Sequence, residues 1–300
     1  MDPISIDAII STSSPVTSHI VAKQLKDKHG IPWVADFRDL WTQNNYYPYS
    51  TLRKAIERRL ELKTLHKADA LVTVSEPAAR QLGILHKGKQ LFAITNGFDP
   101  EEVNSMDEGL TDTFTITYTG NFYPKKRSPE SLFVALRILI SEGIIDVKQV
   151  EVRFYGAEAG WIDKQAERYG LRDIVKQFGI VPREVALDKQ RESQLLLLIK
   201  WNDPRERGVC PAKIFEYLAA RRPILAVGGY DDVISELLDE TRAGTCGPTA
   251  EEVKNILKEL YREYQAVGKA GYKGEEDKIN RYSQREMAQK FAQVLDSVSC

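Results

Sequence analysis

Short apolar runs alternate with segments of helical periodicity along nearly the whole chain. A first series of runs lies at residues 6–11, 33–36, 70–74 and 91–95, with helical patterns near residues 18–28, 51–67 and 77–82. A second series lies at residues 114–119, 150–155, 195–199 and 223–227, with helical patterns near residues 129–141, 160–169, 211–220 and 232–238. Strands that alternate with helices form parallel sheets covered on both faces. We therefore predict an α/β fold with two Rossmann-like, doubly wound parallel-sheet domains.

A polar segment separates the two series. Residues 99–112 are acidic and lack periodicity, which is typical of a linker. We predict a first domain with its linker over residues 1–110, a second domain over residues 111–280, and an amphipathic C-terminal helix within residues 281–300.

Composition excludes several classes of protein. The 300 residues, 42% hydrophobic and 28% charged, fit a soluble globular chain, and the net charge of -1 argues against a general nucleic-acid binder. No apolar run is long enough to span a membrane, and residues 1–10 lack the basic start and apolar core of a signal peptide. Cys210, Cys246 and Cys300 are far apart, which points to a reducing compartment. We therefore expect a cytoplasmic protein.

Residues 211–220 predict a helix whose N-terminus is free to face a ligand. Pro211 suits the first helical position, and Pro223 follows the end of the pattern. The unpaired N–H groups of a helix N-terminus bind anions, and Lys213 adds a full positive charge. Glu216 lies about one turn further on the same face, within reach of a ribose attached to a bound phosphate. The pattern indicates a nucleotide site; the alternative is a surface helix with a Lys–Glu pair.

A second candidate for phosphate contact follows the strand predicted at residues 114–119. Gly120 allows a ligand to approach the backbone closely. Lys125, Lys126 and Arg127 follow in the same loop, and three successive cations can neutralise a diphosphate. The alternative interpretation is a solvated basic loop.

Five segments resemble, in the same order, segments of glycosyltransferase family 4. The most specific is Pro-Ala-Lys-Ile-Phe-Glu-Tyr-Leu-Ala-Ala-x-x-Pro-Ile-Leu-Ala at residues 211–226, which resembles the donor-binding helix of that family. The others are residues 36–41, 72–77, 95–99 and 117–121. The family consists of nucleotide-sugar enzymes with the two-domain GT-B fold. The resemblance therefore implies a GT-B-like chain whose C-terminal helix packs back on the first domain.

The resemblance also implies roles for the candidate residues. In the family, the glutamate at the position of Glu216 holds the ribose hydroxyls of the donor. An Arg and a Lys in the loop that follows Gly120 hold the diphosphate, which places this role on Lys126 and Arg127 together with Lys213.

One departure from the family concerns its paired glutamates. The first of the pair is replaced by Gly208, eight positions before the second. That glutamate usually contacts the sugar of the donor. We predict that the backbone amides of Val209 and Cys210 take over part of its role and bind the donor diphosphate. Gly156, at the end of the strand at residues 150–155, and Val181 are predicted to lie at the nucleobase.

In the first domain, Arg38 and Asp39 follow the strand predicted at residues 33–36, where open parallel sheets bind ligands. Many family members have a His before this Asp that approaches the reacting sugar, and here Arg38 takes its place. A catalytic role for Arg38 and Asp39 is one interpretation, and a structural pair of Arg and Asp is the other. His19 is expected at a helix surface or cap.

The first domain is shorter than in the family, by roughly 80 to 110 residues at about 30 residues per βα unit. A late start of the sequence, a separate polypeptide and a degenerate protein that keeps only the donor site are three interpretations. A half-sheet exposes an unpaired edge, so we expect a homo-oligomer or a partner chain.

The implied activity is transfer of a sugar from a nucleotide diphosphate sugar to a glycan or lipid-linked acceptor, in the synthesis of cell-envelope polysaccharides or glycoconjugates. The resemblance implies retention of anomeric configuration. The Asp-x-Asp motif of metal-dependent transferases is absent from the sequence, so we expect no essential metal and no cofactor. The alternatives are a non-catalytic nucleotide-binding subunit, a truncated transferase that needs a partner, and a nucleotide-sugar epimerase.

The helical segment near residues 51–67 is rich in cations, at positions 53, 54, 58, 59 and 63. Such a helix suits peripheral contact with anionic lipid, at the inner face of a membrane. Glu57 and Glu61 are interleaved with the cations, and the simpler interpretation is an exposed face laced with salt bridges.

Overall fold

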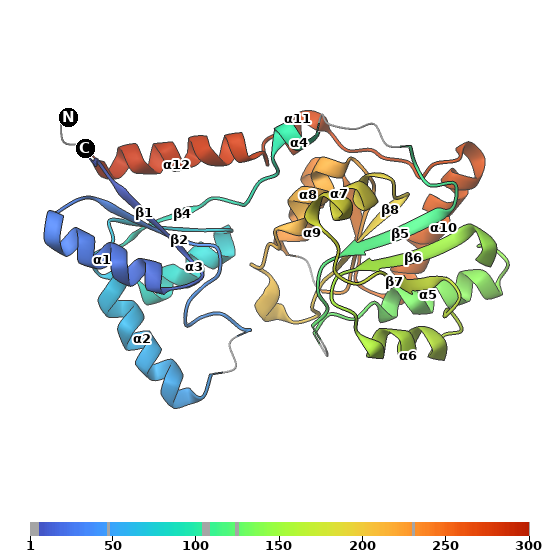
Figure 1. The fold of residues 1–300 in the computed structure, drawn as a ribbon, viewed down its shortest axis with the longest axis horizontal. Coiled ribbons are helices and arrows are strands. Elements are labelled where there is room, and N and C mark those ends of the chain that lie inside the picture. Colours follow the sequence, from blue (N-terminus) through green and yellow to red (C-terminus); the bar gives the residue numbers. More distant parts are fainter. Residues whose placement is uncertain (1–5, 47–48, 104–108, 124–125, 230–231, 300) are drawn as a thin grey trace. The chain divides into compact units, whose positions relative to one another are not determined.

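The computed structural model describes residues 6–46, 49–103, 109–123, 126–229 and 232–299. The chain divides into two compact units, each built on a parallel sheet (Figure 1). Unit 1 comprises Met1–Asn96, Gly208–Cys210 and Gln284–Cys300, and unit 2 comprises Gly97–Arg207 and Pro211–Ser283. The predicted α/β fold with two parallel-sheet domains is confirmed.

The sheet of unit 1 has the order β1-β2-β3-β4, with every neighbouring pair parallel. Its strands are β1 (Ile9–Ser13), β2 (Trp33–Phe37), β3 (Ala70–Thr73) and β4 (Gln90–Ala93). The helices of this unit are α1 (Thr17–His29), α2 (Thr51–Leu65), α3 (Glu76–Leu85) and α12 (Gln284–Ser299).

Alternating side chains build two separate cores on the two faces of this sheet. Trp33, Ala35 and Phe37 of β2 form one core with residues of α1, α2 and α3. Val34 faces the other way and packs in a core with Val294 of α12. Because successive side chains of a strand point to opposite faces, one strand serves both cores.

The sheet of unit 2 has the order β10-β9-β8-β5-β6-β7, also parallel. Its strands are β5 (Phe114–Thr119), β6 (Val150–Tyr155), β7 (Val175–Gln177), β8 (Leu195–Ile199), β9 (Ile224–Val227) and β10 (Gly244–Gly247). The strand order reverses between β5 and β8. In open α/β sheets, ligands bind beyond the carboxyl ends of the strands at such a switch point.

Helices cover both faces of this second sheet (Figure 1). The main core joins one face of the sheet to α5 (Glu130–Ser141), α6 (Gly160–Arg168) and α10 (Ala250–Val267). The remaining longer helices of the unit are α7 (Arg183–Arg191), α8 (Lys213–Ala220) and α9 (Val233–Thr241), and the short ones are α4 (Pro100–Val103) and α11 (Glu276–Asn280). None of the helices in the described part of the chain is long and apolar enough to cross a membrane.

Threonines on β5 attach α7 and the segment after it to the second face of this sheet. Thr119 Oγ1 accepts a hydrogen bond from Gln190 Nε2 at 2.9 Å, and Thr117 Oγ1 accepts one from the Ser193 hydroxyl at 2.6 Å. Thr119 and Thr117 are buried on the face opposite the apolar core. This polar attachment fixes the position of α7 beside α8.

Element boundaries differ from the predictions by a few residues. The strand predicted at residues 6–11 is β1 at Ile9–Ser13. The helix predicted from residue 211 begins at Lys213, after Ala212, which provides no side-chain cap. The elements α7, α10, β7 and β10 were not predicted.

His19 is fully buried, so the predicted helix surface or cap position is wrong. Its Nδ1 lies 2.7 Å from the Ser11 hydroxyl, which also accepts a hydrogen bond from Trp33 Nε1. Its Nε2 is buried without a hydrogen-bond partner among the described residues. Burial lowers the pKa of His19 from 6.5 to about 4, because the charged imidazolium cannot be solvated there.

Unit 1 is therefore expected to lose stability in mild acid. Below pH 6.5, the pKa of His19 in the unfolded chain, the unfolded state binds a proton at His19, whereas the folded state binds it only when the pH falls to about 4. The free energy of unfolding should fall by about 2 kcal/mol between neutral pH and about pH 5. Urea unfolding at several pH values measures this loss, and His19→Asn, which cannot titrate, should reduce it. An equal loss in the variant would assign the acid sensitivity to other groups.

The acidic residues of α2 face into unit 1. Glu61 is fully buried and accepts hydrogen bonds from the Thr42 backbone N–H at 3.2 Å and from the Thr42 hydroxyl, while its other oxygen lies 3.2 Å from His86 Nε2. Glu57, 23% exposed, accepts a hydrogen bond from Trp41 Nε1 at 3.0 Å. The predicted exposed face laced with salt bridges is therefore wrong. Within α2, the described ion pair of these glutamates with the helix cations is Arg53 to Glu57, at 3.8 Å.

Candidate functional site

Glycines follow three neighbouring strands of unit 2 at their carboxyl ends. Gly120 follows β5, Gly156 follows β6 and Gly179 lies just beyond β7, all with positive φ. The Gly120 N–H donates to the Tyr155 carbonyl at 2.7 Å, and the Gly156 N–H donates to the Gly179 carbonyl at 2.9 Å. A Cβ on Gly156 would overlap the carbonyl of Gly120. At the carboxyl ends of these strands, the backbone segments are therefore packed closely together, and the three glycines leave the backbone uncovered by side chains of their own.

The side chain of Lys213, in the first turn of α8, reaches these glycines. A Cβ on Gly120 would overlap the ammonium of Lys213, which lies 3.9 Å from the centroid of the Tyr118 ring. Burial and, to a lesser extent, the charge of the nearby Arg127 lower the pKa of Lys213 to about 7, and Glu216 opposes this shift. The predicted proximity of Gly120 and Lys213 is therefore present, and the partly desolvated amine would gain from a bound anion.

Lys126 and Arg127 lie against aromatic rings at the same side of unit 2. The Lys126 ammonium is 4.5 Å from the centroid of the Trp201 ring, just beyond β8, and the Arg127 guanidinium is 5.1 Å from that of Tyr123. Such cation–π contacts hold cations at defined positions. Lys125, the third predicted cation of this loop, lies outside the described residues.

Glu216 is held by two residues of α7. Gln190, fully buried, donates from Nε2 to Glu216 Oε2 at 3.4 Å, and Arg183 Nε lies 3.8 Å from Oε1. Arg183 in turn forms a bidentate pair with Glu102 of α4, at 2.6 and 2.9 Å. The side chain of Glu216 remains 34% exposed. Its carboxylate is oriented and still accessible to a ligand hydroxyl.

Sequence reasoning missed Gln190 and Arg183. Gln190 Nε2 bridges Thr119 at the end of β5 and Glu216 on α8, so it links the strand that carries Gly120 to the predicted ribose-binding carboxylate. Gln190 is a positioning residue in this arrangement. A buried polar residue on a polar helix gives no sequence signal without the fold.

The region predicted for the nucleobase follows β7. Val181 is half-buried there, next to Ile180, which is 80% exposed. The ring of Phe178 stacks on that of Tyr155 with centroids 4.8 Å apart. Gly156 and Val181 thus flank an aromatic pair at the carboxyl edge, and their contact with a base remains a prediction.

Val209 and Cys210 belong to unit 1 by their contacts, whereas Lys213 and Glu216 belong to unit 2. The Ser75 hydroxyl, which also caps α3, donates to the Gly208 carbonyl at 2.7 Å. Cys210 is buried. The predicted contact of the Val209 and Cys210 amides with a diphosphate stays a prediction.

Arg38 takes part in a structural network of unit 1. Its guanidinium donates from Nε to Asp36 at 2.9 Å and from Nη1 to the Ile94 carbonyl at 2.9 Å. Burial raises the pKa of Asp36, and the charge of Arg38 opposes that rise. The Asp39 carbonyl accepts from the Ser13 hydroxyl at 3.5 Å. These contacts are the ones expected if Arg38 forms a structural pair with an Asp. A catalytic role for Arg38 and Asp39 remains a prediction.

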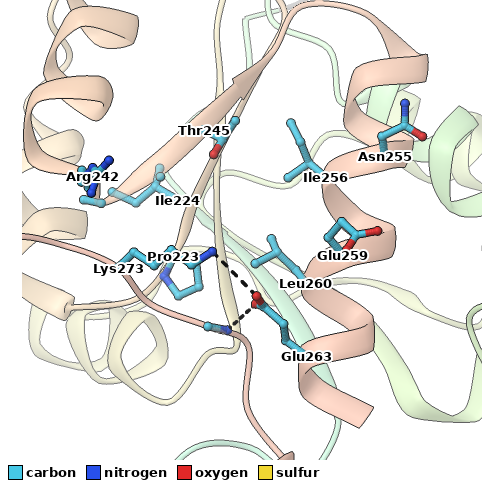
Figure 2. Close-up of a pocket in the computed structure, with 13 residues that line it drawn as sticks. Pro223, Ile224, Arg242, Thr245, Asn255, Ile256, Glu259, Leu260, Glu263 and Lys273 are labelled. Atoms are coloured by element: carbon cyan, nitrogen blue, oxygen red, sulfur yellow. Dashed lines mark hydrogen bonds and ion pairs between the residues drawn. The ribbon is translucent and has the colours of Figure 1, made fainter. Parts of the chain in front are cut away.

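A pocket of about 370 Å³ lies at the opposite edge of the unit 2 sheet (Figure 2). Ile224 and Gly244, which line it, are the first residues of β9 and β10. Glu263 of α10 accepts a hydrogen bond from the Gly271 N–H there at 3.0 Å. Because ligands of open α/β sheets bind beyond the carboxyl ends, this pocket is separate from the candidate site. Among the described residues, no group of three His, Cys, Asp or Glu side chains could hold a metal ion.

The chain is similar to known proteins in part of its sequence and in its fold. Residues 4–87 match the model of the glycosyl transferase 4-like domain. The structure of HepE from Anabaena in complex with UDP and glucose is similar at a TM-score of 0.70 and 16% identity, over 96% of this chain and 78% of that one. Sucrose-phosphate synthase from Thermosynechococcus elongatus is similar at a TM-score of 0.65 and 16% identity, over 97% of this chain and 73% of that one. The lipopolysaccharide outer core galactosyltransferase WaaB is similar at a TM-score of 0.60 and 13% identity, over 98% of this chain and 76% of that one.

The chain has the GT-B fold of glycosyltransferases. The match over residues 4–87 confirms the resemblance to glycosyltransferase family 4 in that part of the chain and supports the expected glycosyltransferase. No curated protein sequence matches the chain.

Proposed function

We propose that the chain transfers a sugar from a nucleoside diphosphate sugar to a glycan or lipid-linked acceptor. The observation that carries this proposal is the amine of the half-buried Lys213, which lies beside Gly120 at the carboxyl end of β5 in unit 2. A diphosphate there would restore the solvation that the amine loses on burial. HepE was solved with UDP-glucose, so a uridine diphosphate sugar is the first donor to test. Cell-envelope polysaccharides or glycoconjugates are the proposed products.

In the proposed reaction, the bond between the anomeric carbon and the diphosphate oxygen breaks through an oxocarbenium-like transition state. Negative charge develops on the leaving phosphate, where Lys213, Lys126 and Arg127 stabilise it. The acceptor hydroxyl attacks from the same face and gives its proton to the departing phosphate, so anomeric configuration is retained. Cations of the chain neutralise the leaving group, and we propose that no divalent ion is required. Activity should then be unchanged by a chelator of divalent ions.

Glu216 is proposed to accept hydrogen bonds from the ribose hydroxyls of the donor. Glu216→Ala is expected to weaken UDP binding about 10- to 100-fold, because hydrogen bonds to a charged acceptor are lost. Calorimetric titration measures this loss. The wild-type chain should bind UDP more tightly than its 2′,3′-dideoxy analogue, and Glu216→Ala should bind the two equally.

The matched control is Glu251→Ala, at an exposed position of α10, which should leave both affinities unchanged. If Glu216→Ala still preferred UDP to the dideoxy analogue by the full wild-type factor, the ribose would be bound by other residues.

A further inference from the structure

Two arginines of α7 hold Glu102, in the short helix α4. Arg183, the first residue of α7, binds the Glu102 carboxylate with both of its Nη atoms. Arg191, the last residue of α7, donates from Nη2 to the Glu102 carbonyl at 2.9 Å. The side chain of Arg191 is only 16% exposed and also pairs with Asp188 at 2.9 Å. Both the backbone and the side chain of Glu102 are therefore fixed relative to α7.

Arg183 lies between two glutamates. Its Nη atoms are bound to Glu102, while its Nε lies 3.8 Å from Glu216 Oε1, which is too far for a hydrogen bond. The hydrogen bonds from Arg183 lower the pKa of Glu102, so this pair stays charged at neutral pH. Arg183 thus places a positive charge beside Glu216 without occupying the oxygens of its carboxylate.

The oxygens of Glu216 have a limited capacity for hydrogen bonds. An ionised carboxylate offers about four lone-pair positions, and Gln190 Nε2 takes one of them at 3.4 Å. The two hydroxyls of a bound ribose would take two more. If Arg183 turned the edge formed by its Nε and one Nη onto Glu216, it would form the parallel pair of hydrogen bonds that is typical of Arg and carboxylate. Too few positions would then remain for the ribose.

We propose that Glu102 is a positioning residue of the ribose site, which binds Arg183 and thereby keeps this guanidinium from covering Glu216. The inference rests on the proposed binding of the donor ribose by Glu216. Helix α4, which contacts α8, controls the affinity for the donor in this way without touching the donor itself.

Calorimetric titration of Glu102 variants with UDP tests this role. Glu102→Ala should weaken UDP binding about two- to fivefold, because the released Arg183 pairs with Glu216 at a partly exposed position. Glu102→Asp, which keeps the carboxylate, should lose less. In steady-state kinetics, Glu102→Ala should raise KM for the donor and leave kcat unchanged, since the reacting anomeric carbon is not affected.

A second substitution separates competition from structural damage. Arg183→Ala should weaken UDP binding slightly in the wild-type chain, where it removes an orienting charge. The same substitution should strengthen UDP binding in Glu102→Ala, where it removes the competitor of the ribose. Effects of opposite sign in the two chains are expected only if Arg183 covers Glu216 when Glu102 is absent.

Glu167→Ala serves as the control, because Glu167 pairs with Arg172 at 3.5 Å on the exposed surface of the same unit, and UDP affinity should not change. Circular dichroism confirms that each variant is folded. Wild-type affinity in Glu102→Ala would overturn the proposal, and so would weakening by Arg183→Ala in both chains. If Glu216→Ala still weakened binding in either case, only the role of Glu102 would fall. If the wild-type chain bound no UDP, or Glu216→Ala bound it equally well, the ribose site itself would be wrong.

Discussion

Replacing Lys213 by Met is expected to lower kcat/KM for the nucleotide-sugar donor by about 10²- to 10³-fold, or roughly 3 to 4 kcal/mol. The Lys213 ammonium lies beside Gly120, at the carboxyl end of β5, where the diphosphate is proposed to bind. A full positive charge in a partly buried site stabilises a developing phosphate charge more than a fully exposed one can. Met preserves most of the apolar stem that packs on Tyr118, so the fold should persist. Steady-state kinetics with purified variants measures the loss.

The same residue predicts a pH dependence of donor binding. With a pKa of about 7 in the free chain, Lys213 is charged below that value and increasingly neutral above it. A bound diphosphate favours the charged form and raises this pKa, so affinity should fall as the pH rises above about 7, by up to about tenfold per pH unit. Lys213→Met should remove this dependence, and Lys213→Arg should remove it while keeping a charge. Wild-type affinity in Lys213→Met would show that the diphosphate lies elsewhere.

Asp232→Ala is expected to destabilise unit 2 by about 3 to 5 kcal/mol. Asp232 pairs with Lys200 at 2.9 Å, and the two side chains are 8% and 7% exposed. Asp232 also caps α9, because its carboxylate accepts from the N–H groups of Ile234 and Ser235 at 3.1 Å each. One substitution thus removes the carboxylate from a buried ammonium and removes a helix cap, which is worth about 1 kcal/mol by itself.

Asp232→Asn separates these two contributions. Asn is also a good N-cap residue, so this variant keeps the cap and loses the charge, and it should recover about 1 kcal/mol relative to Asp232→Ala. Thermal or urea unfolding measures both values. A loss below about 1 kcal/mol in Asp232→Ala would contradict a contribution of the buried ion pair beyond the cap.

The prediction of the strands from sequence depended on apolar runs, and it failed where those runs are absent. The apolar strands of both units were predicted because parallel strands are buried on both faces. The sequence of β7 is Val-Lys-Gln and that of β10 is Gly-Thr-Cys-Gly, and neither contains an apolar run. The helix α7, Arg-Glu-Val-Ala-Leu-Asp-Lys-Gln-Arg, attaches largely through hydrogen bonds, so it lacks an apolar stripe.

In the candidate site too, some residues could be predicted from the sequence and others could not. Lys213 and Glu216 could be predicted because helix geometry relates residues three apart, and Gly120 because a glycine after a strand permits close approach. Gln190 and Arg183 could not, because they reach Glu216 from another helix. The inward orientation of Glu61 depends on Thr42 and His86, whose positions only the folded chain defines.

Unit 2 is proposed to hold a nucleoside diphosphate sugar through Lys213 and Glu216. Calorimetric titration of the purified chain with uridine, guanosine and adenosine diphosphates tests it most directly. We predict selective binding of one nucleotide, weakened by both Lys213→Met and Glu216→Ala. A folded chain that binds none of the three, or binds one with both variants at wild-type affinity, would contradict the claim.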